Sequence, residues 1–430
     1  MRVGTGQVDI TPAPGRHRRL AVASGELSGF VARVQPSAGI HDRLLARALL
    51  VDDGTERLLW LHADLIGFER SFVDDLKAEL RRRHGLQPRQ VIVSATHTHS
   101  GPPTVPLVNC GQYDAAYVRR LKTDLLSAAA GALGSAGPAE LVWAEGRCEL
   151  AVDRRGKASV HADPRVGVLG WRRPDGSFVA VLANYAMHNV ALGPENRLIS
   201  ADVAGQAARH VEEHLAGGPT VLLTNGACGN LNPPSVGNDF AQMQAWGDQL
   251  GGAVVAALGQ AASAVDATVR AELCTLGLPI VRLDESSVRA LAARQRERLI
   301  GHGDYVSARC RAAIDEWERH MERRIRGGPI AAGEPMDLQA LRIGPAVLVA
   351  VGAEPFSRLT DELRALSGRT VYVVGYANGL VGYLAPVQTY DEGGYEVDGA
   401  FVFYGGPPVA AGAYEFLREW AARLVGRVSS

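Results

Sequence analysis

The stretch VIVSATHTHSGPP, residues 91–103, says most about how this chain folds. Its first five residues, 91–95, are short, apolar and mostly β-branched, a pattern that is typical of a buried β-strand. The chain then leaves that strand through a polar segment that carries His97 and His99. Residues at positions i and i+2 of an extended chain point to the same side. The stretch therefore predicts a buried strand whose end presents two imidazoles to one place.

These two histidines are open to two interpretations. In α/β folds, ligands collect at the ends of strands, and converging imidazoles at such a point suggest a metal. Histidines can also be structural residues that are satisfied by hydrogen bonds. On spacing alone, we weigh a metal or catalytic role about equally with a structural role.

Strand-like and helix-like segments alternate along the rest of the chain. The predicted strands are 44–51, 57–65, 139–148, 166–172, 178–185, 220–224, 346–351 and 370–374, and the predicted helices are 69–84, 115–133, 204–216, 240–264 and 414–425. This alternation predicts an α/β fold of mixed β-sheets layered with helices. No Pro/Gly/Ser-rich linker divides the chain, so we expect one domain over residues 1–430. The charged, helical segment 285–327, broken near residues 301–303, is expected to be a helical hairpin inserted into it.

The composition is that of an ordinary globular protein and argues against a nucleic-acid-binding protein and an integral membrane protein. Of the 430 residues, 47% are hydrophobic and 21% are charged, and the net charge of −1 predicts no nucleic-acid partner. No charge-free apolar stretch is long enough for an integral membrane segment. The five scattered cysteines form no CxxC pair, which favours a reducing compartment. The N-terminus has no basic-then-apolar leader, so we expect a cytoplasmic protein. We also expect a small-molecule substrate, and the protein could form a homo-oligomer.

Polar residues also follow other predicted strands. His188 comes after strand 178–183, and Glu354 comes after strand 347–351. Taken alone, His188 is more readily explained as a satisfied core histidine. Two histidines and a glutamate that all follow buried strands are together typical of a zinc site with two imidazoles and one carboxylate. Asp202 is about equally suited to orient a ligand histidine and to cap the helix that follows it.

Several unusual motifs occur in one order along the chain. They are GTGQVDITP (4–12), GIHDRLLARALLVDD (39–53), SATHTHSGP (94–102), NYAMHNV (184–190) with ISADVAG (199–205), GAEPF (352–356), and GYANGLVGYLAP (375–386) with GGYE (393–396). In these motifs the chain resembles the neutral/alkaline non-lysosomal ceramidases. The resemblance implies that family's catalytic domain and its zinc-dependent chemistry.

The resemblance also implies roles for individual residues. The zinc ligands that it implies are His97, His188, Glu354 and Tyr383. Imidazole, carboxylate and phenolate oxygen all suit Zn2+. His99 would lie next to the ligands or face the substrate, and Arg154 would contact the substrate. Tyr395, twelve residues after Tyr383, would donate a hydrogen bond to the substrate carbonyl or its oxyanion.

The chain departs from the family in two respects. The family carries a GDVSPN-type hexapeptide with an important serine, whereas residues 229–234 read GNLNPP, so Asn232 stands at the serine. An amide is not a nucleophile, but it can donate a hydrogen bond to an oxyanion. The chain also ends soon after the tyrosine motif, which implies that the family's C-terminal β-sandwich is absent.

We therefore expect a zinc-dependent amidohydrolase that cleaves the carboxamide bond of an N-acyl amine by metal-activated water. Two alternatives stay open. The first is a zinc-dependent esterase, or a non-hydrolytic lyase or cyclase, that acts on a small metabolite, because fold and metal do not fix the reaction. The second is a non-catalytic binding homologue that lost its chemistry together with the serine.

Overall fold

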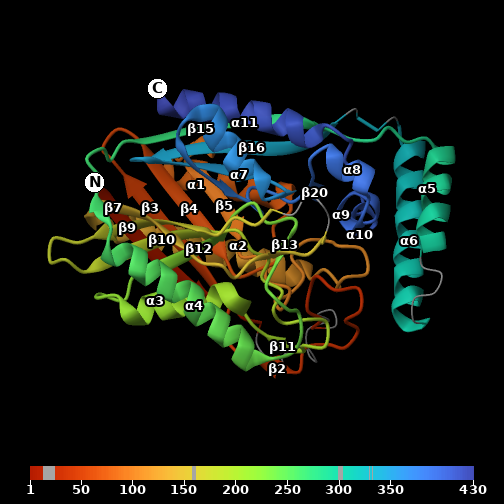
Figure 1. Cartoon of the computed structure of the whole chain (residues 1–430), viewed down its shortest axis with the longest axis horizontal. Helices are drawn as coiled ribbons and strands as arrows, with labels where there is room; N and C mark the ends of the chain where they lie inside the picture. The colour runs from red at the N-terminus through yellow and green to blue at the C-terminus, as the bar shows by residue number, and fades with distance from the viewer. Residues whose placement is uncertain (13–24, 157–160, 299–303, 329, 332) are drawn as a thin grey trace.

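Three β-sheets lie at the centre of the molecule, and helices pack on each of them (Figure 1). This computed structural model describes residues 1–12, 25–156, 161–298, 304–328, 330–331 and 333–430. The first sheet has the strand order β5-β4-β3-β1-β6. Its strands are β1 (Arg2–Asp9), β3 (Leu45–Asp52), β4 (Arg57–Ala63), β5 (Val91–Ala95) and β6 (Gly137–Pro138).

The second and third sheets follow in the chain. The second has the order β12-β10-β9-β7-β14 and the third has the order β15-β16-β17-β19. The strands of the second are β7 (Glu140–Arg147), β9 (Arg165–Arg172), β10 (Phe178–Tyr185), β12 (Thr220–Asn225) and β14 (Ala262–Ser263). Those of the third are β15 (Val269–Pro279), β16 (Gly333–Ile343), β17 (Ala346–Val351) and β19 (Thr370–Val374).

Three short strand pairs connect the loops around these sheets. They are β2 (Gly39–Ile40) with β11 (Leu198–Ile199), β8 (Val152–Asp153) with β13 (Leu231–Asn232), and β18 (Glu354–Pro355) with β20 (Tyr383–Leu384). The last pair is parallel, and its register places Glu354 opposite Tyr383.

Helices cover the outer faces of the sheets. The first sheet packs against α2 (Ala115–Gly134), next to α1 (Arg70–His84); the second packs against α3 (Asp202–His214) and α4 (Phe240–Gly259); and the third packs against α7 (Arg358–Ser367) and α11 (Ala413–Ser429). The hairpin of α5 (Glu285–Arg298) and α6 (Asp304–Arg326) stands beside the main body, next to α8 (Gln388–Glu392), α9 (Tyr395–Asp398) and α10 (Ala400–Tyr404) (Figure 1).

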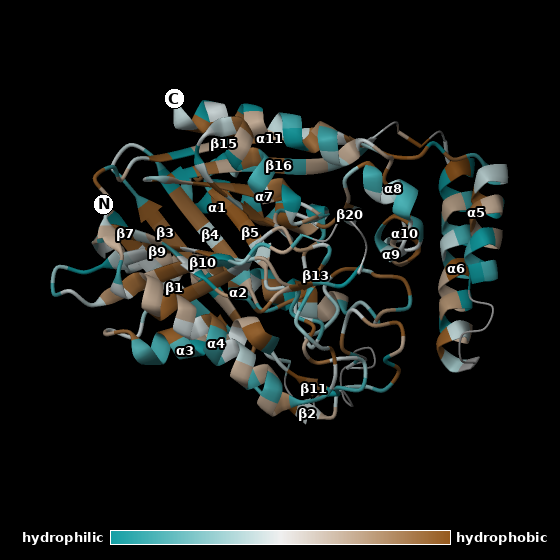
Figure 2. Cartoon of the chain, viewed as in Figure 1, coloured by the Kyte–Doolittle hydropathy of each residue, from teal (hydrophilic) through white to brown (hydrophobic). Residues whose placement is uncertain are grey.

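One apolar core joins the inner faces of all three sheets. It includes Trp60 of the first sheet, Trp171 of the second and Leu348 of the third, each at most 3% exposed. Figure 2 shows that apolar residues concentrate along these central strands. Because close packing leaves little freedom to shift, this shared core fixes the sheets relative to one another.

Each sheet also contains one pair of parallel neighbours. These pairs are β4–β5, β10–β12 and β17–β19. Backbone contacts bring their carboxyl ends together: the amide of Gly226, after β12, bonds to the carbonyl of Tyr185, and the amide of Gly375, after β19, bonds to that of Asn225. Since ligands bind at the carboxyl ends of parallel strands, this convergence is where a site is expected.

The expected α/β fold with mixed sheets and helical layers is confirmed. Several details differ from expectation. The helix expected over 240–264 ends at Gly259, where the chain turns into β14. The long strands β15 and β16 and the helices α7, α8, α9 and α10 were not expected. The expected break at residues 301–303 lies outside the described residues. Among the described helices, none is both long and apolar enough to cross a membrane.

Candidate metal centre

Three side chains, each from a segment that follows a strand of a different sheet, meet beyond the carboxyl ends of β5, β10 and β17. The Nε2 atoms of His97 and His188 lie 3.6 Å and 2.9 Å from Oε2 of Glu354. One ligand atom from each residue lies within 4.8 Å of the other two, and all three residues are buried. This donor set, two imidazoles and a carboxylate from three strand ends, is one that zinc accepts.

Main-chain carbonyls orient both imidazoles. Nδ1 of His97 lies 2.6 Å from the carbonyl oxygen of Ile66, and Nδ1 of His188 lies 2.8 Å and 2.9 Å from those of Cys228 and Leu231. Because carbonyl oxygens only accept hydrogen bonds, each Nδ1 carries a proton and each Nε2 faces the centre. A carbonyl on the far nitrogen is the usual support of a metal-binding histidine.

The two imidazoles differ in their affinity for a second proton. Burial lowers the pKa of His97 to about 4, although the Glu354 carboxylate opposes this effect. Burial also acts to lower the pKa of His188, but Cys228 and Glu354 outweigh it and raise that pKa to about 9. A metal ion at this site would therefore have to displace a proton from Nε2 of His188, as is general for metal sites.

Tyr383 lies beside this cluster, as the resemblance implies. Its Cα atom is the register partner of that of Glu354, and its hydroxyl lies 3.1 Å from Nη2 of Arg154. Burial and Glu354 raise the pKa of Tyr383 well above 10, whereas Arg154 opposes this shift. A phenolate at this position therefore needs a further positive charge, which a metal ion supplies.

Two further tyrosines, which the sequence analysis did not single out, contact the same carboxylate. The Tyr376 hydroxyl lies 3.2 Å from Oε2 of Glu354, and the Tyr404 hydroxyl donates to Oε1. Tyr376 is part of the motif that contains Tyr383, so position in that motif was the one signal that pointed to it. No sequence pattern marks Tyr404, which lies at the end of α10.

A cavity of about 860 Å³ opens next to the cluster. All the expected substrate-facing residues line it, together with two expected ligands: His99, Arg154, His188, Asn232, Tyr383 and Tyr395. Apolar side chains form most of the remaining wall, among them Phe30, Val31, Val190, Ile314 and Phe403. The α5–α6 hairpin contributes Ile314 and therefore helps to shape the cavity.

His99 and Tyr395 both line this cavity. Nε2 of His99 lies 3.2 Å from Nε2 of His97, and burial, with the nearby positive charges, lowers the pKa of His99 well below 6.5. Tyr395 is 49% exposed towards the cavity. Burial of its hydroxyl raises its pKa above 10, so Tyr395 keeps its proton and can act as a hydrogen-bond donor.

Arg154 directs four of its five N–H donors at protein atoms. It donates to Glu396 Oε1 at 3.0 Å, Asn232 Oδ1 at 3.2 Å, the Gly229 carbonyl at 2.8 Å and the Tyr383 hydroxyl at 3.1 Å. Arg154 therefore ties the Asn232 loop to Tyr383. Because Oδ1 of Asn232 accepts from Arg154, the amide nitrogen remains the group that Asn232 can offer to a ligand.

Asp202 does not orient a ligand histidine. Its carboxylate accepts from the backbone amides of Ala191, Leu192 and Val203 at 3.3, 3.1 and 2.7 Å. Carbonyl oxygens already occupy the Nδ1 atoms of both ligand histidines. Asp202 therefore holds the start of α3 against the loop that follows His188.

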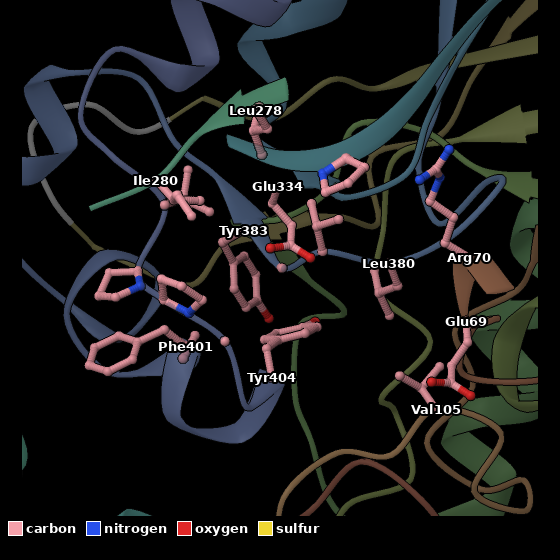
Figure 3. Close-up of a pocket in the computed structure, with 18 of the residues that line it drawn as sticks. Glu69, Arg70, Val105, Leu278, Ile280, Glu334, Leu380, Tyr383, Phe401 and Tyr404 are labelled. Carbon is pink, nitrogen blue, oxygen red and sulfur yellow. The ribbon is translucent and has the colours of Figure 1, made fainter. Parts of the chain in front are cut away.

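A second cavity, of about 440 Å³, borders the centre on another side (Figure 3). Tyr383 and Tyr404, whose ring centroids are 6.3 Å apart, lie between Ile280 and Phe401 on one side and Leu380 on the other. Tyr383 lines both cavities, so its ring is part of the partition between them.

Comparisons with known proteins agree with the resemblance seen in the motifs. The family model "Neutral/alkaline non-lysosomal ceramidase, N-terminal" matches residues 1–141. The crystal structure of neutral ceramidase from Pseudomonas aeruginosa superposes with a TM-score of 0.75, covering 99% of this chain and 75% of that one at 19% identity. This chain is similar to the neutral ceramidases. A ceramidase structure complexed with C2 gives the same TM-score at 18% identity.

Two neutral ceramidases are also similar in sequence. That of Pseudomonas aeruginosa is 24% identical over 256 residues, and that of Mycobacterium tuberculosis is 26% identical over 253 residues. These matches cover 54% and 52% of this chain, and 37% and 38% of the two ceramidases. The chain thus matches less than two fifths of the length of these curated relatives. The structural match covers 99% of this chain, so the similarity of fold extends well beyond residues 1–141.

Proposed function

We propose that this chain is a zinc-dependent hydrolase that cleaves the carboxamide bond of an N-acyl amine by metal-activated water. The observation that carries the proposal is the buried cluster of His97, His188 and Glu354 beside a largely apolar cavity. When bound, zinc supplies Lewis acidity, which activates water near neutral pH and polarises a carbonyl group. Tyr383, next to Glu354, is the fourth proposed ligand.

The protein's own residues stabilise the transition state in this proposal. As water attacks the scissile carbonyl, negative charge develops on its oxygen, and Tyr395 donates a hydrogen bond to that oxygen. The amide nitrogen of Asn232 is a second donor. Arg154 holds Tyr383 and Asn232 in place, and the remaining hydrogen of its Nη1 is the donor that it can offer to the substrate.

A proton must also reach the leaving amine. His99 is the proposed carrier, because its neutral imidazole accepts a proton from the attacking water and releases it to the amine nitrogen. Its low pKa makes it a weak base but a strong proton donor once protonated. Its Nδ1 has no partner among the described residues.

The cavity indicates the class of substrate. Phe30, Val190, Ile314 and Phe403 offer an apolar surface to one half of the amide, where an alkyl or aryl group fits. Ceramide, which the relatives' name specifies, has such a half, and an N-acyl amine with an apolar acyl chain is the broader class that we propose.

Turnover of a series of N-acyl amines tests the proposed function. The zinc-loaded chain is expected to release acid and amine in equal amounts, to stop when a chelator removes the metal, and to recover when zinc returns. Hydrolysis of matched esters alone would favour the esterase. Bound zinc without hydrolysis of any acyl compound would favour a lyase or cyclase, and absence of metal binding would favour a binding protein.

Substitution of Asn232 tests the direct attack of water. Asn232→Ala is expected to retain measurable activity, with a loss no greater than the roughly 100-fold to 1,000-fold of one missing oxyanion donor, because no nucleophile is removed. Asn232→Ser should create no covalent step. Intact-protein mass spectrometry under turnover should find no acylated chain, and amine should not appear in a burst ahead of acid. Trapping an acylated side chain would overturn the direct mechanism.

A further inference from the structure

We propose that Tyr376 is a positioning residue of the metal centre, which together with Tyr404 clamps the two oxygens of Glu354. This inference rests on the proposed metal site and adds to it a contribution to metal affinity from outside the four ligands. Tyr376 reaches all three members of the metal-binding cluster. Its hydroxyl lies 3.2 Å from Oε2 of Glu354 and 3.3 Å from Nε2 of His188, and its ring stacks on His97 with 4.0 Å between centroids.

The clamp holds each carboxylate oxygen separately. Tyr376 donates to Oε2 of Glu354, and Tyr404 donates to Oε1. A carboxylate whose two oxygens both accept hydrogen bonds cannot rotate freely about its last torsion angle. The clamp therefore presents Oε2, the oxygen that faces the two imidazoles, in a fixed direction. Hydrogen bonds to a ligating carboxylate are a general means of orienting it towards a metal.

Cys228 fixes the direction of the Tyr376 hydroxyl. The thiol sulfur lies 3.2 Å from that hydroxyl oxygen, and both residues are fully buried. A phenol has one hydrogen to donate and can accept others. If the thiol supplies its hydrogen to Tyr376, the phenol hydrogen is left for Glu354. The order of donation is then Cys228 to Tyr376 to Glu354.

The backbone of Tyr376 lies in a conformation that non-glycine residues rarely adopt. Its φ is 54°, in the left-handed region, and such a conformation persists only where the surroundings fix it. Two backbone hydrogen bonds do so: its amide donates to Ala353, directly before Glu354, and its carbonyl accepts from Ala95, two residues before His97. Tyr376 is thus tied to the strand ends that deliver two of the ligands.

The substitution Tyr376→Phe tests the role of the hydroxyl. It keeps the ring that stacks on His97 and removes the hydrogen bond to Glu354. We expect zinc affinity, measured by competition with a chelator of known affinity, to fall about 10-fold to 100-fold, the usual effect of losing a partner of a metal ligand. Thermal unfolding in the presence of chelator should change less than unfolding in the presence of zinc.

Variants of Cys228 provide an independent measurement and a rescue. Cys228→Ala removes the donor to Tyr376 and should weaken zinc binding in the same direction, whereas Cys228→Ser supplies a hydroxyl donor and should restore most of the affinity. Tyr414→Phe is the matched control. Tyr414 is also buried and its hydroxyl lies 3.1 Å from Oε2 of Glu362, but it packs among α7, α11 and the third sheet, so zinc affinity should not change.

The outcomes separate this inference from the proposed function. Zinc affinity of Tyr376→Phe within twofold of the unmodified chain would overturn the clamp. Loss of zinc as complete as in His188→Ala would make Tyr376 a ligand and would likewise overturn a positioning role. If the unmodified chain itself binds no zinc, the proposed function fails first, and the inference fails with it.

Discussion

His188→Ala is expected to lose most of its zinc and all of its amide hydrolysis. The substitution removes one of two imidazoles and leaves the Glu354 carboxylate, which His188 approaches to 2.9 Å, buried with one partner fewer. Elemental analysis of the purified chain, expected to give about one zinc per unmodified molecule, provides the measurement. His97→Ala should behave in the same way.

A histidine outside the centre provides the control for this experiment. His320 lies on α6, in the hairpin, and His320→Ala should keep both zinc and activity. Full zinc content in His188→Ala would exclude His188 as a principal ligand. A chain that loses zinc but keeps its activity would contradict the metal-dependent mechanism itself.

Tyr395→Phe is expected to keep its zinc and to lose turnover by roughly 100-fold to 1,000-fold, the usual size of losing one oxyanion donor. The expectation depends on its position: Tyr395 is exposed towards the large cavity and keeps its proton. Because the contact forms in the transition state, kcat should fall more than KM rises. Steady-state kinetics and elemental analysis of the same preparation measure both properties.

The neighbouring Tyr383 should respond in the opposite way. Tyr383→Phe removes a proposed ligand oxygen, so zinc affinity should fall. Tyr390→Phe is a suitable control, because the Tyr390 hydroxyl bonds to the Val409 carbonyl at 3.1 Å and borders only the smaller cavity. Equal loss of zinc from Tyr383→Phe and Tyr395→Phe would show that the two tyrosines have been assigned the wrong positions relative to the metal.

The sequence predicted the apolar strands of the fold and missed two polar ones. The central strands of the first and second sheets are short runs of apolar residues, which have a clear local signal. By contrast, β16 buries Asp337 and Gln339, and β15 alternates irregularly. Their polar groups are satisfied from far along the chain: Asp337 accepts from Thr275, and Gln339 bonds to Asn378. Such partners cannot be read from a local pattern.

The sequence likewise predicted some residues of the candidate site and missed others. Histidines and a glutamate that follow apolar strands predicted the cluster, because the ends of parallel strands converge in three dimensions. Tyr404 and Glu396 come from short helices late in the chain, and their contacts with Glu354 and Arg154 depend on tertiary packing alone. Glycine is the usual sequence signal of a left-handed backbone conformation, and the residue that adopts it here is Tyr376.

The placement of one proposed ligand after a strand of each main sheet also bears on how this chain stays folded. Positions 97, 188 and 354 lie far apart in the sequence, yet their side chains meet at one point. An ion held there would act as a reversible cross-link that closes two long loops, and closing a long loop restricts the unfolded chain more than the folded one. The concentration of free metal would then set the resistance of the whole chain to unfolding, because whatever binds the folded state alone stabilises it by mass action.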